Sequence, residues 1–370
     1  MPNHDLEVLT DNAGGRDRWV RLLRDWSRHE VYAHPSFLSL FAGPGDSPRC
    51  LRYEDHLGEV LYPMILRDLD RLPFVDAAFG RAHDAVSTPY GYGGPFVRTD
   101  GDTTGLVRRF HQAYRDWARD VRLVSEYTTF SPATGVTAAY PGDIGERMPV
   151  VVKALDTADI LSDIKRPQRE AIRRADRLGV VVEVDTEGRD AEAFIRLCSE
   201  TSTRRGGFSG GHAVSREFTD VLLRELGDYV VFFHARLESR IVSSVLVLLS
   251  GDTVVAFRGG TASDALNTRA NQLLQFRISD WGRQAGYRWY LLGGGNTAAP
   301  SDPLFVYKKS FATTGVRMLN TGKWMAEPEY YDRLVTMRRR FEEDRGAAFE
   351  PVEDYFPAYR APSAEQAEGV

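Results

Sequence analysis

The distribution of hydrophobic and polar positions along the first 150 residues predicts helices and strands in alternation. Apolar residues at positions 19, 20, 22, 23 and 26 follow the spacing of one helical face, and they predict a helix over 16–32. The pattern also predicts a two-stranded hairpin over 50–69 with its turn at Leu57-Gly58, an amphipathic helix over 104–120, a strand over 121–130 and a loop over 131–147.

A second and longer set of elements begins near Val150. The pattern predicts strands over 150–155 and 179–185, helices over 157–178, 189–203 and 215–226, antiparallel strands over 229–238, 240–251 and 252–261, a helix over 269–285, a strand over 287–294, a loop ending at Tyr307-Lys308-Lys309, a strand over 316–324 and a helix over 328–345. This order resembles the acyltransferase layout of the GNAT superfamily, and the first 150 residues show a weaker version of it.

The predicted fold class is therefore α+β, with two tandem GNAT-like domains that each have a mixed central sheet. A chain of 370 residues is long enough for two hydrophobic cores. We expect an N-terminal domain over 1–150, a C-terminal domain over 151–327, a C-terminal helix over 328–360 and a disordered tail over 361–370.

Charge and composition narrow the classes of function. The net charge is −5, so the surface as a whole does not indicate nucleic-acid binding, and an anionic partner must be met by local basic groups. We expect no membrane-spanning helix, since no apolar run has the necessary length, and the N-terminus has no signal-peptide pattern. Cys50 and Cys198 fit a reducing cytoplasm, and the scattered histidines predict no metal site.

A basic segment lies at the head of the second set of elements. Six basic residues stand against two acids, a local charge of +4: Lys165, Arg166, Arg169, Arg173, Arg174 and Arg177. The arginines at 166, 169, 173 and 177 share one face of the predicted helix. Such a face can bind phosphates bidentately, and it can equally be a solvated helix surface.

Two glycine-rich segments are candidates for substrate contact. The segment 87-STPYGYGGPFV-97 predicts a turn that presents Tyr90 and Tyr92, either to line a substrate groove or to pack on the first domain. The segment 200–218 has four glycines after Arg204-Arg205, and it predicts a mobile lid or a long connector.

The residues at the start of the predicted helix over 269–285 indicate whether the chain can bind acyl-CoA as an acyl donor. In an acyl-CoA-dependent GNAT enzyme a glycine-containing loop stands here, and its backbone N–H groups bind the pyrophosphate. This chain has Asn267-Thr268-Arg269-Ala270-Asn271-Gln272, without a glycine. Close approach of a pyrophosphate to this backbone is therefore not favoured.

Two adjacent lysines stand between aromatic residues in 305-FVYKKSF-311. If the backbone is extended there, Lys308 and Lys309 point to opposite sides, so that one enters a cleft and the other reaches solvent. A lysine in a cleft can stabilise an oxyanion, and the alternative is that both extend from a strand edge into water. The sequence shows no Ser-His-Asp or Cys-His pattern for covalent catalysis.

Together these segments resemble the FemABX family of peptidoglycan bridge-forming aminoacyltransferases, over about residues 15–345. The resemblance is carried by KRPQREAIRRADRLGVVVEV, 201-TSTRRGGF-208, 257-FRGGT-261, 305-FVYKKSF-311 and the loop STPYGYGGP. The chain departs from the family at Tyr307, where Phe is frequent, and at Ala312, where Gly is usual. No coiled-coil arm is visible either, which makes a small peptide or biosynthetic intermediate as good an acceptor as peptidoglycan.

The resemblance implies an enzyme that takes aminoacyl-tRNA as donor and uses no other cofactor. An amine of a peptide, cell-wall precursor or natural-product intermediate attacks the tRNA ester, and an amide forms without a covalent enzyme intermediate. The N-terminal domain then faces the acceptor, and the C-terminal domain holds the donor. By position, Lys308 stabilises the oxyanion and Tyr307 shapes its pocket. The acceptor site is assigned to Tyr90, Tyr92, Arg204, Phe208 and Arg258, and tRNA phosphates to Lys165, Arg166, Arg169, Arg173 and Arg174.

Two other functions are compatible with the same sequence features. An N-acyltransferase that uses acyl-CoA or a carrier-protein thioester needs a pyrophosphate site, which 267–272 does not offer in the usual form. A non-catalytic GNAT-fold module would bind RNA or a partner and would have no turnover.

Overall fold

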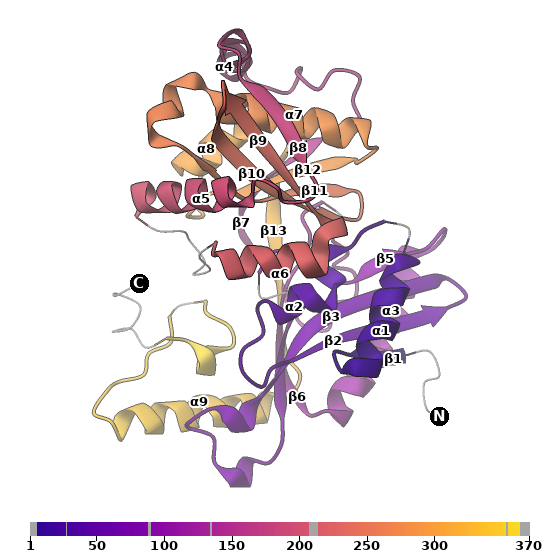
Figure 1. The fold of residues 1–370 in the computed structure, drawn as a ribbon. Coiled ribbons are helices and arrows are strands. Elements are labelled where there is room, and N and C mark those ends of the chain that lie inside the picture. The colour runs from indigo at the N-terminus through magenta and orange to yellow at the C-terminus, as the bar shows by residue number, and fades with distance from the viewer. Residues whose placement is uncertain are drawn as a thin grey trace. The chain divides into compact units, whose positions relative to one another are not determined.

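The computed structural model describes residues 6–26, 28–87, 90–133, 135–206, 214–352 and 354–362, which form two compact units (Figure 1). Unit 1 comprises the described residues up to Leu22, Tyr32–Glu146 and those from Asn320 onward, and unit 2 comprises Leu23–Val31 and Arg147–Leu319. The units thus differ from the expected domains at three segments. Residues 23–31 and 147–150 belong to unit 2, and 320–327 belong to unit 1.

Unit 1 is built on a mixed sheet with strand order β1-β2-β3-β4-β6-β13, and β5 pairs with β3. Among its described strands, β4 and β6 pair in parallel, and β1 with β2, β2 with β3, β3 with β4, β3 with β5 and β6 with β13 are antiparallel. Its elements are β1 (Leu6–Thr10), α1 (Ala13–Arg24), α2 (Pro35–Ser39), β2 (Ser47–Asp55), β3 (Gly58–Asp68), β4 (His83–Ser87), β5 (Phe96–Arg98), α3 (Thr103–Asp120), β6 (Leu123–Thr129), the end of β13 (Val316–Met325) and α9 (Pro328–Glu343).

The core of unit 1 follows from the alternation of side chains along β3. Tyr62, Met64 and Leu66 point to one face, where they pack against Leu106, Phe110 and Tyr114 of α3. Residues of β3 that point to the other face, including Leu61 and Ile65, are also buried. A strand covered on both faces explains the continuous apolar run of this segment, which alternation alone would not predict.

In unit 2 the strands pair in the order β7-β12-β11-β10-β9-β8. Its strands are antiparallel except for the pair β11 and β12. Its elements are β7 (Asp143–Ala154), α4 (Arg166–Arg177), β8 (Val181–Asp185), α5 (Ala191–Arg205), α6 (Arg216–Leu226), β9 (Val230–Leu237), β10 (Arg240–Ser250), β11 (Thr253–Thr261), α7 (Ala270–Gln284), β12 (Trp289–Gly294) and α8 (Pro303–Lys309).

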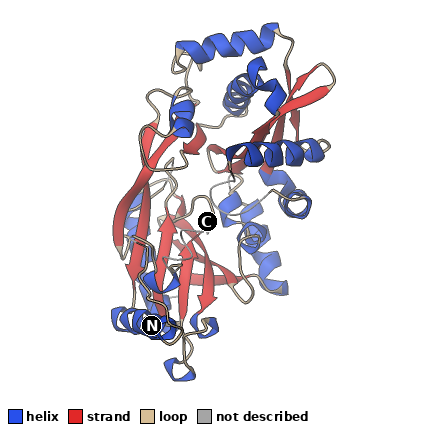
Figure 2. Cartoon of the chain, turned by 90° about the vertical axis from the view of Figure 1, so that its left-hand side faces the viewer, coloured by secondary structure: helices blue, strands red, loops and turns tan. Residues whose placement is uncertain are grey.

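Helices α5 and α7 cover opposite faces of the strands in unit 2. Phe232 of β9 makes an edge-to-face contact with Phe194 of α5, whereas the next residue, Phe233, contacts Trp281 of α7. Successive side chains of a strand point to opposite faces, so the two helices lie on opposite sides. Figure 2 shows helices packed against the strands of each unit. The sheet is therefore a buried middle layer that fixes where both helices begin and end.

Most predicted elements are present, with four corrections. The predicted helix over 16–32 ends at Arg24, and the one over 157–178 begins only at Arg166. The predicted loop over 131–147 contains the start of β7 at Asp143, and the loop before Tyr307 contains the helix α8. The short elements β1, α2, β4 and β5 were not predicted. Most of the expected disordered tail, 363–370, lies outside the described residues.

We predict that Gly260→Ala destabilises unit 2, because a methyl group at this position of β11 would overlap the backbone of Leu197 and Cys198 in α5. The expected loss is on the order of 3 kcal/mol in the free energy of unfolding, measured by urea titration. Gly227→Ala is the control, since nothing lies within contact of a side chain there. Equal effects of the two substitutions would contradict the close packing of α5 on β11.

Candidate functional site

The candidate site lies in unit 2, where the parallel pair β11 and β12 stops pairing early. The two strands pair over three residues, from Thr253 with Trp289 to Val255 with Leu291. Beyond them β11 continues to Thr261 alongside β10, and β12 continues to Gly294 alongside β7. Their facing edges are therefore not hydrogen-bonded to each other, and side chains of α7 and α8 are anchored there.

Helix α8 places the two lysines, and it corrects the extended conformation considered above. Asp302 accepts hydrogen bonds from the backbone N–H groups of Leu304 and Phe305, and Pro303 occupies the first helical position. An acidic N-cap followed by proline is a strong start signal for a helix. Lys308 and Lys309 are therefore neighbours on a helix, about 100° apart around its axis, rather than on opposite sides of a strand.

Lys308 is held at the end of β12 by a hydrogen bond from its Nζ to the Gly294 carbonyl oxygen, at 2.7 Å. Burial lowers the pKa of Lys308 to about 8, helped by the positive charges of Arg205 and Arg258 and opposed by Asp302. The ammonium form still predominates at neutral pH. An ammonium has three N–H groups, so this lysine can donate to a ligand while keeping its bond to Gly294.

Tyr307 belongs to a hydrogen-bonded chain that links α8 to α7. Its hydroxyl donates to Asn271 Oδ1 at 3.3 Å, and the same oxygen accepts from Gln275 Nε2 at 3.1 Å. Gln275 Oε1 in turn accepts from the buried Tyr290 hydroxyl at 2.5 Å. Asn271 and Gln275 were not predicted as site residues, although their spacing of four on α7 places them on one helical face. The chain fixes the position of the Tyr307 ring.

Lys153 is a second buried lysine that sequence analysis missed. It lies on β7, is 1% exposed, and donates from Nζ to the carbonyl of Phe311 at 3.1 Å, just after α8. Burial lowers its pKa. The apolar setting of VVVKAL was the available signal, because a lysine inside a buried strand needs a specific acceptor. We regard it as a support for α8.

The predicted acceptor residues of unit 2 differ in how they are placed. Arg204 is held at the end of β11, because its guanidinium donates to the Thr261 carbonyl at 3.1 Å and to the Ser263 hydroxyl at 2.7 Å. Arg258 is half-buried on β11, and its positive charge acts to lower the pKa of both Lys308 and Cys198. Phe208 lies outside the described residues.

The predicted acceptor tyrosines belong to unit 1 and pack there on other aromatic rings. Tyr90 stacks on Phe41 with ring centroids 5.4 Å apart, and Tyr92 contacts the edge of Tyr32 at 6.0 Å. Both are half-buried, and burial raises the pKa of Tyr92. Their rings are thus part of an aromatic cluster, with a fraction of each left exposed.

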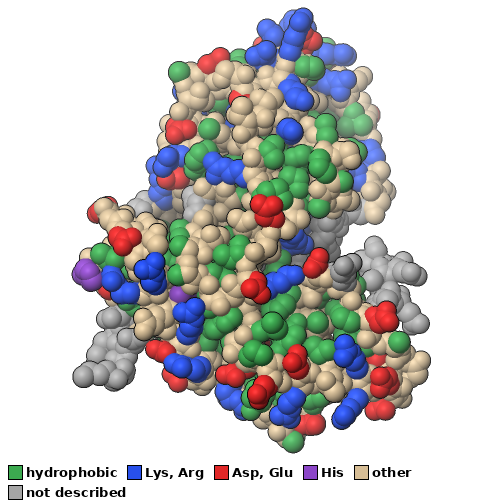
Figure 3. Space-filling view, turned by 180° about the vertical axis from the view of Figure 1, so that it is seen from behind, with side chains coloured by type: hydrophobic (Ala, Val, Ile, Leu, Met, Phe, Trp, Pro, Cys, Tyr) green, Lys and Arg blue, Asp and Glu red, His purple; other side chains and the backbone are tan. Residues whose placement is uncertain are grey.

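The predicted tRNA-binding residues form an exposed surface on α4. Ile172 and Ala175 face the core, while Lys165, Arg166, Arg173 and Arg174 are exposed and Arg169 is half-exposed. Arg166 pairs with Glu170 at 2.8 Å, which leaves the rest of the local positive charge in solvent. Figure 3 shows Lys and Arg side chains gathered at the top of the view, over α4. The cations share one helix, as predicted.

The first turn of α7 is occupied by its own chain. Ala270 N–H donates to the Thr268 hydroxyl at 3.3 Å, and Gln272 N–H donates to the Arg269 carbonyl at 3.0 Å. Arg269 itself has a φ of 63°, in the region that glycine adopts at least cost. Two of the N–H groups that could hold a pyrophosphate are therefore already bonded.

A Ser-His-Asp arrangement does exist, contrary to the sequence-based expectation. The Ser244 hydroxyl lies 3.0 Å from Nδ1 of His234, whose Nε2 lies 3.5 Å from Asp185. The register of β8, β9 and β10 brings these distant residues together, which spacing in the sequence does not reveal. All three are buried, so the arrangement has no open side for a substrate.

Among the described residues, the one group of possible metal ligands is largely engaged in other bonds, and both thiols are buried. Asp185, Asp190 and His234 have ligand atoms within 4.8 Å of one another. However, Asp185 accepts three backbone N–H groups and Asp190 pairs with Arg236. Burial raises the pKa of the Cys198 thiol to about 12, and it also raises that of Cys50, so neither thiolate forms at neutral pH.

Comparison with known proteins identifies the fold. Residues 162–309, from just before α4 to the end of α8, match a family model described as an acetyltransferase (GNAT) domain. Among solved structures, FemX matches with a TM-score of 0.65 at 12% identity, over 88% of this chain and 99% of its own. No curated protein sequence matches.

Two further structures have the same fold. The C-terminal domain (DUF2156) of a putative lysylphosphatidylglycerol synthetase from Agrobacterium fabrum has a TM-score of 0.52 at 15% identity, over 85% of this chain and 92% of its own. L-PGS from Bacillus licheniformis has a TM-score of 0.53 at 14% identity, over 87% of this chain and 94% of its own.

The chain has a FemABX-like GNAT fold, and the predicted class of two GNAT-like domains with mixed sheets is confirmed. The match to the acetyltransferase (GNAT) domain supports an acyltransferase enzyme. Across the described part of the chain, every helix is too short or too polar to cross a membrane.

We predict that Arg205→Gln raises the pKa of Lys308, because the positive charge of Arg205 disfavours the ammonium form. The rise should be roughly half a pH unit, since Arg205 is exposed and its field is screened. The measurement is an NMR titration of ¹³C-methylated lysines, with the Lys308 signal assigned by its loss in Lys308→Arg. Arg339→Gln, an exposed arginine of unit 1, is the matched control, and an unchanged midpoint in Arg205→Gln would contradict this placement.

Proposed function

We propose that the chain is an aminoacyl-tRNA-dependent aminoacyltransferase that forms an amide on an amine of a peptide, a cell-wall precursor or a natural-product intermediate. The observation that carries this proposal is the combination of a cationic Lys308, within reach of the charge of Arg258, with a first turn of α7 in which the N–H groups of Ala270 and Gln272 are already bonded. The site suits a carbonyl that develops negative charge and is poorly prepared for a pyrophosphate. The FemX-like fold supports it.

The reaction needs no group on the enzyme to become acylated. The acceptor amine attacks the ester carbonyl carbon, the C–N bond forms, and the C–O bond to the terminal ribose breaks. The proton lost by the amine passes to the leaving ribose oxygen, directly or through water. A tRNA ester is already activated, so positioning and oxyanion stabilisation account for the acceleration. The raised pKa of Cys198 fits a mechanism without a thiol nucleophile.

Lys308 is the proposed catalytic residue, because its remaining N–H groups can donate to the oxyanion while Gly294 holds its position. Tyr307, fixed by Asn271, shapes the adjoining pocket. Beyond these two, we assign the acceptor to Tyr90, Tyr92, Arg204, Phe208 and Arg258, and the tRNA phosphates to the exposed face of α4 with Lys165, Arg166, Arg169, Arg173 and Arg174. Arginines on one helix suit a phosphate backbone.

The proposed co-substrate is aminoacyl-tRNA, with no further cofactor, and the proposed location is the cytoplasm. The two buried free cysteines suit a reducing compartment. Oligomeric state plays no part in the proposal, since the residues assigned to catalysis lie within unit 2 of one chain.

An acyl-CoA-dependent N-acyltransferase is the alternative, and the match of residues 162–309 to the acetyltransferase (GNAT) model favours it. In that case acetyl-CoA would approach α7 through contacts other than the first-turn N–H groups of Ala270 and Gln272.

A donor assay separates the two functions. The purified chain is given tRNAs charged with labelled amino acids or, separately, labelled acetyl-CoA, with a pool of amines and peptides as acceptors. We expect label to enter a new amide only from the charged tRNAs, and RNase pretreatment of the donor to abolish it. Transfer from acetyl-CoA alone would overturn the proposal.

We predict that Lys308→Ala lowers turnover by on the order of 10²-fold, as for the loss of an oxyanion donor. Binding of tRNA, measured by filter retention, should barely change, because the phosphates are assigned to the cations of α4 and not to Lys308. Lys309→Ala is the matched control on the same helix, and it should retain the normal rate. A full rate in Lys308→Ala, or equal losses in both variants, would remove Lys308 from the mechanism.

A further inference from the structure

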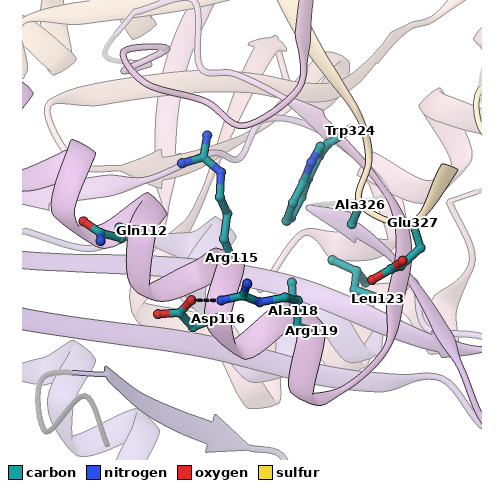
Figure 4. A pocket seen from close by; sticks show the side chains of 9 residues that line it. All are labelled: Gln112, Arg115, Asp116, Ala118, Arg119, Leu123, Trp324, Ala326 and Glu327. Atoms are coloured by element: carbon teal, nitrogen blue, oxygen red, sulfur yellow. Dashed lines mark hydrogen bonds and ion pairs between the residues drawn. The ribbon is translucent and has the colours of Figure 1, made fainter. Parts of the chain in front are cut away.

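Unit 1 has a cavity of about 350 Å³ between α3 and the connection from β13 to α9. Figure 4 shows the side chains that line it, which come from the C-terminal half of α3, from Leu123 at the start of β6 and from residues 324–327. Its apolar lining is Ala118, Leu123 and Ala326 together with the indole of Trp324. The predicted functional residues are all elsewhere, so the proposed function does not account for this cavity.

Polar groups on the cavity wall lack partners among the residues that the structure describes. Arg115 and Glu327 make no hydrogen bond or ion pair with their side chains, and the same holds for Gln112 and for the indole N–H of Trp324. Arg119 and Asp116, which also line the cavity, are paired with each other. One cation and one carboxylate are therefore left for a ligand.

The positions of Trp324 and Glu327 are fixed by their surroundings. The Trp324 ring packs against the buried Tyr114 ring, with centroids 5.3 Å apart. The N–H groups of Ala326 and Glu327 both donate to the Val124 carbonyl, at 2.9 and 3.2 Å. Glu327 is the N-cap residue of α9, yet its carboxylate accepts no bond from the first turn. The ring of Trp324 and the backbone at Glu327 are thus held by the fold, and this carboxylate is not used to cap the helix.

The charges in the cavity indicate the class of ligand. The four ionised side chains, Arg115, Arg119, Asp116 and Glu327, sum to zero, so a polyanion such as a nucleotide is not favoured. In Figure 4, Arg115 and Glu327 lie on either side of Trp324. A ligand could contact all three of these side chains if it placed a carboxylate beside Arg115, an ammonium beside Glu327 and a flat apolar group on the indole.

We propose that this cavity binds a small zwitterion of the amino-acid type, with its carboxylate on Arg115, its ammonium on Glu327 and a flat side chain on Trp324. The proposal does not depend on the aminoacyltransferase function, since it needs only the described residues of unit 1. Binding here and transfer at Lys308 can therefore fail or succeed separately.

Calorimetry with matched probes tests the proposal on the full chain. The probes are L-phenylalanine, L-phenylalaninamide, which lacks the carboxylate, N-acetyl-L-phenylalanine, which lacks the ammonium, and AMP as a polyanion. We expect L-phenylalanine to bind at least about tenfold more tightly than each of the other three, since charge-assisted hydrogen bonds are the strong ones.

The variants assign each charge to its residue. In Arg115→Gln, L-phenylalanine and its amide should bind alike, and in Glu327→Gln, L-phenylalanine and its N-acetyl form should bind alike, as a double-mutant cycle requires. Arg339→Gln, an exposed arginine of unit 1 that does not line the cavity, is the control and should leave the tenfold preference in place. Absence of binding at millimolar L-phenylalanine, equal binding of all probes, or tighter binding of AMP would overturn the proposal.

Discussion

One buried carboxylate, that of Asp302, fixes the segment on which the candidate site depends. Its oxygens accept hydrogen bonds from the backbone N–H groups of Asn296, Thr297, Leu304 and Phe305, at 2.9 to 3.1 Å. The first two hold the turn after β12, and the last two start α8. These bonds lower the pKa of Asp302, so the charge persists. Because both segments converge on one side chain, Lys308 is held against the Gly294 carbonyl.

Each unit contains a parallel strand pair, and the two pairs differ in how far their strands stay hydrogen-bonded. In unit 1, β4 and β6 stay paired from His83 to Ser87. The space beside them is filled by Glu126, which accepts from Tyr62 at 2.6 Å and from Tyr140 at 3.3 Å, and burial raises its pKa to about 7. In unit 2, β11 and β12 pair over three residues and then separate, and Lys308 of α8 donates a hydrogen bond to the end of β12. This difference is the physical reason for placing transfer chemistry in unit 2.

The predictable part of the fold was the part with strong local periodicity. The hairpin about Leu57-Gly58, the amphipathic helix α3 and the strands β9 to β11 all follow from the order of apolar residues. The sequence identifies the lysine pair, but its pattern predicts a loop in place of α8, although Asp302-Pro303 is a helix start signal. Asn271, Gln275 and the Ser244-His234-Asp185 contact depend on register and helix packing, which spacing along the chain does not encode.

The central claim is that the region at Lys308 and α7 receives an aminoacyl ester and does not bind a pyrophosphate. The most direct measurement is a calorimetric titration of the full chain with acetyl-CoA, and then with a short RNA helix that ends in an unpaired CCA carrying an amide-linked amino acid. The account predicts saturable binding of the charged RNA, and no saturable binding of acetyl-CoA. Saturable binding of acetyl-CoA, with none of the charged RNA, would contradict it and favour the acyl-CoA-dependent enzyme.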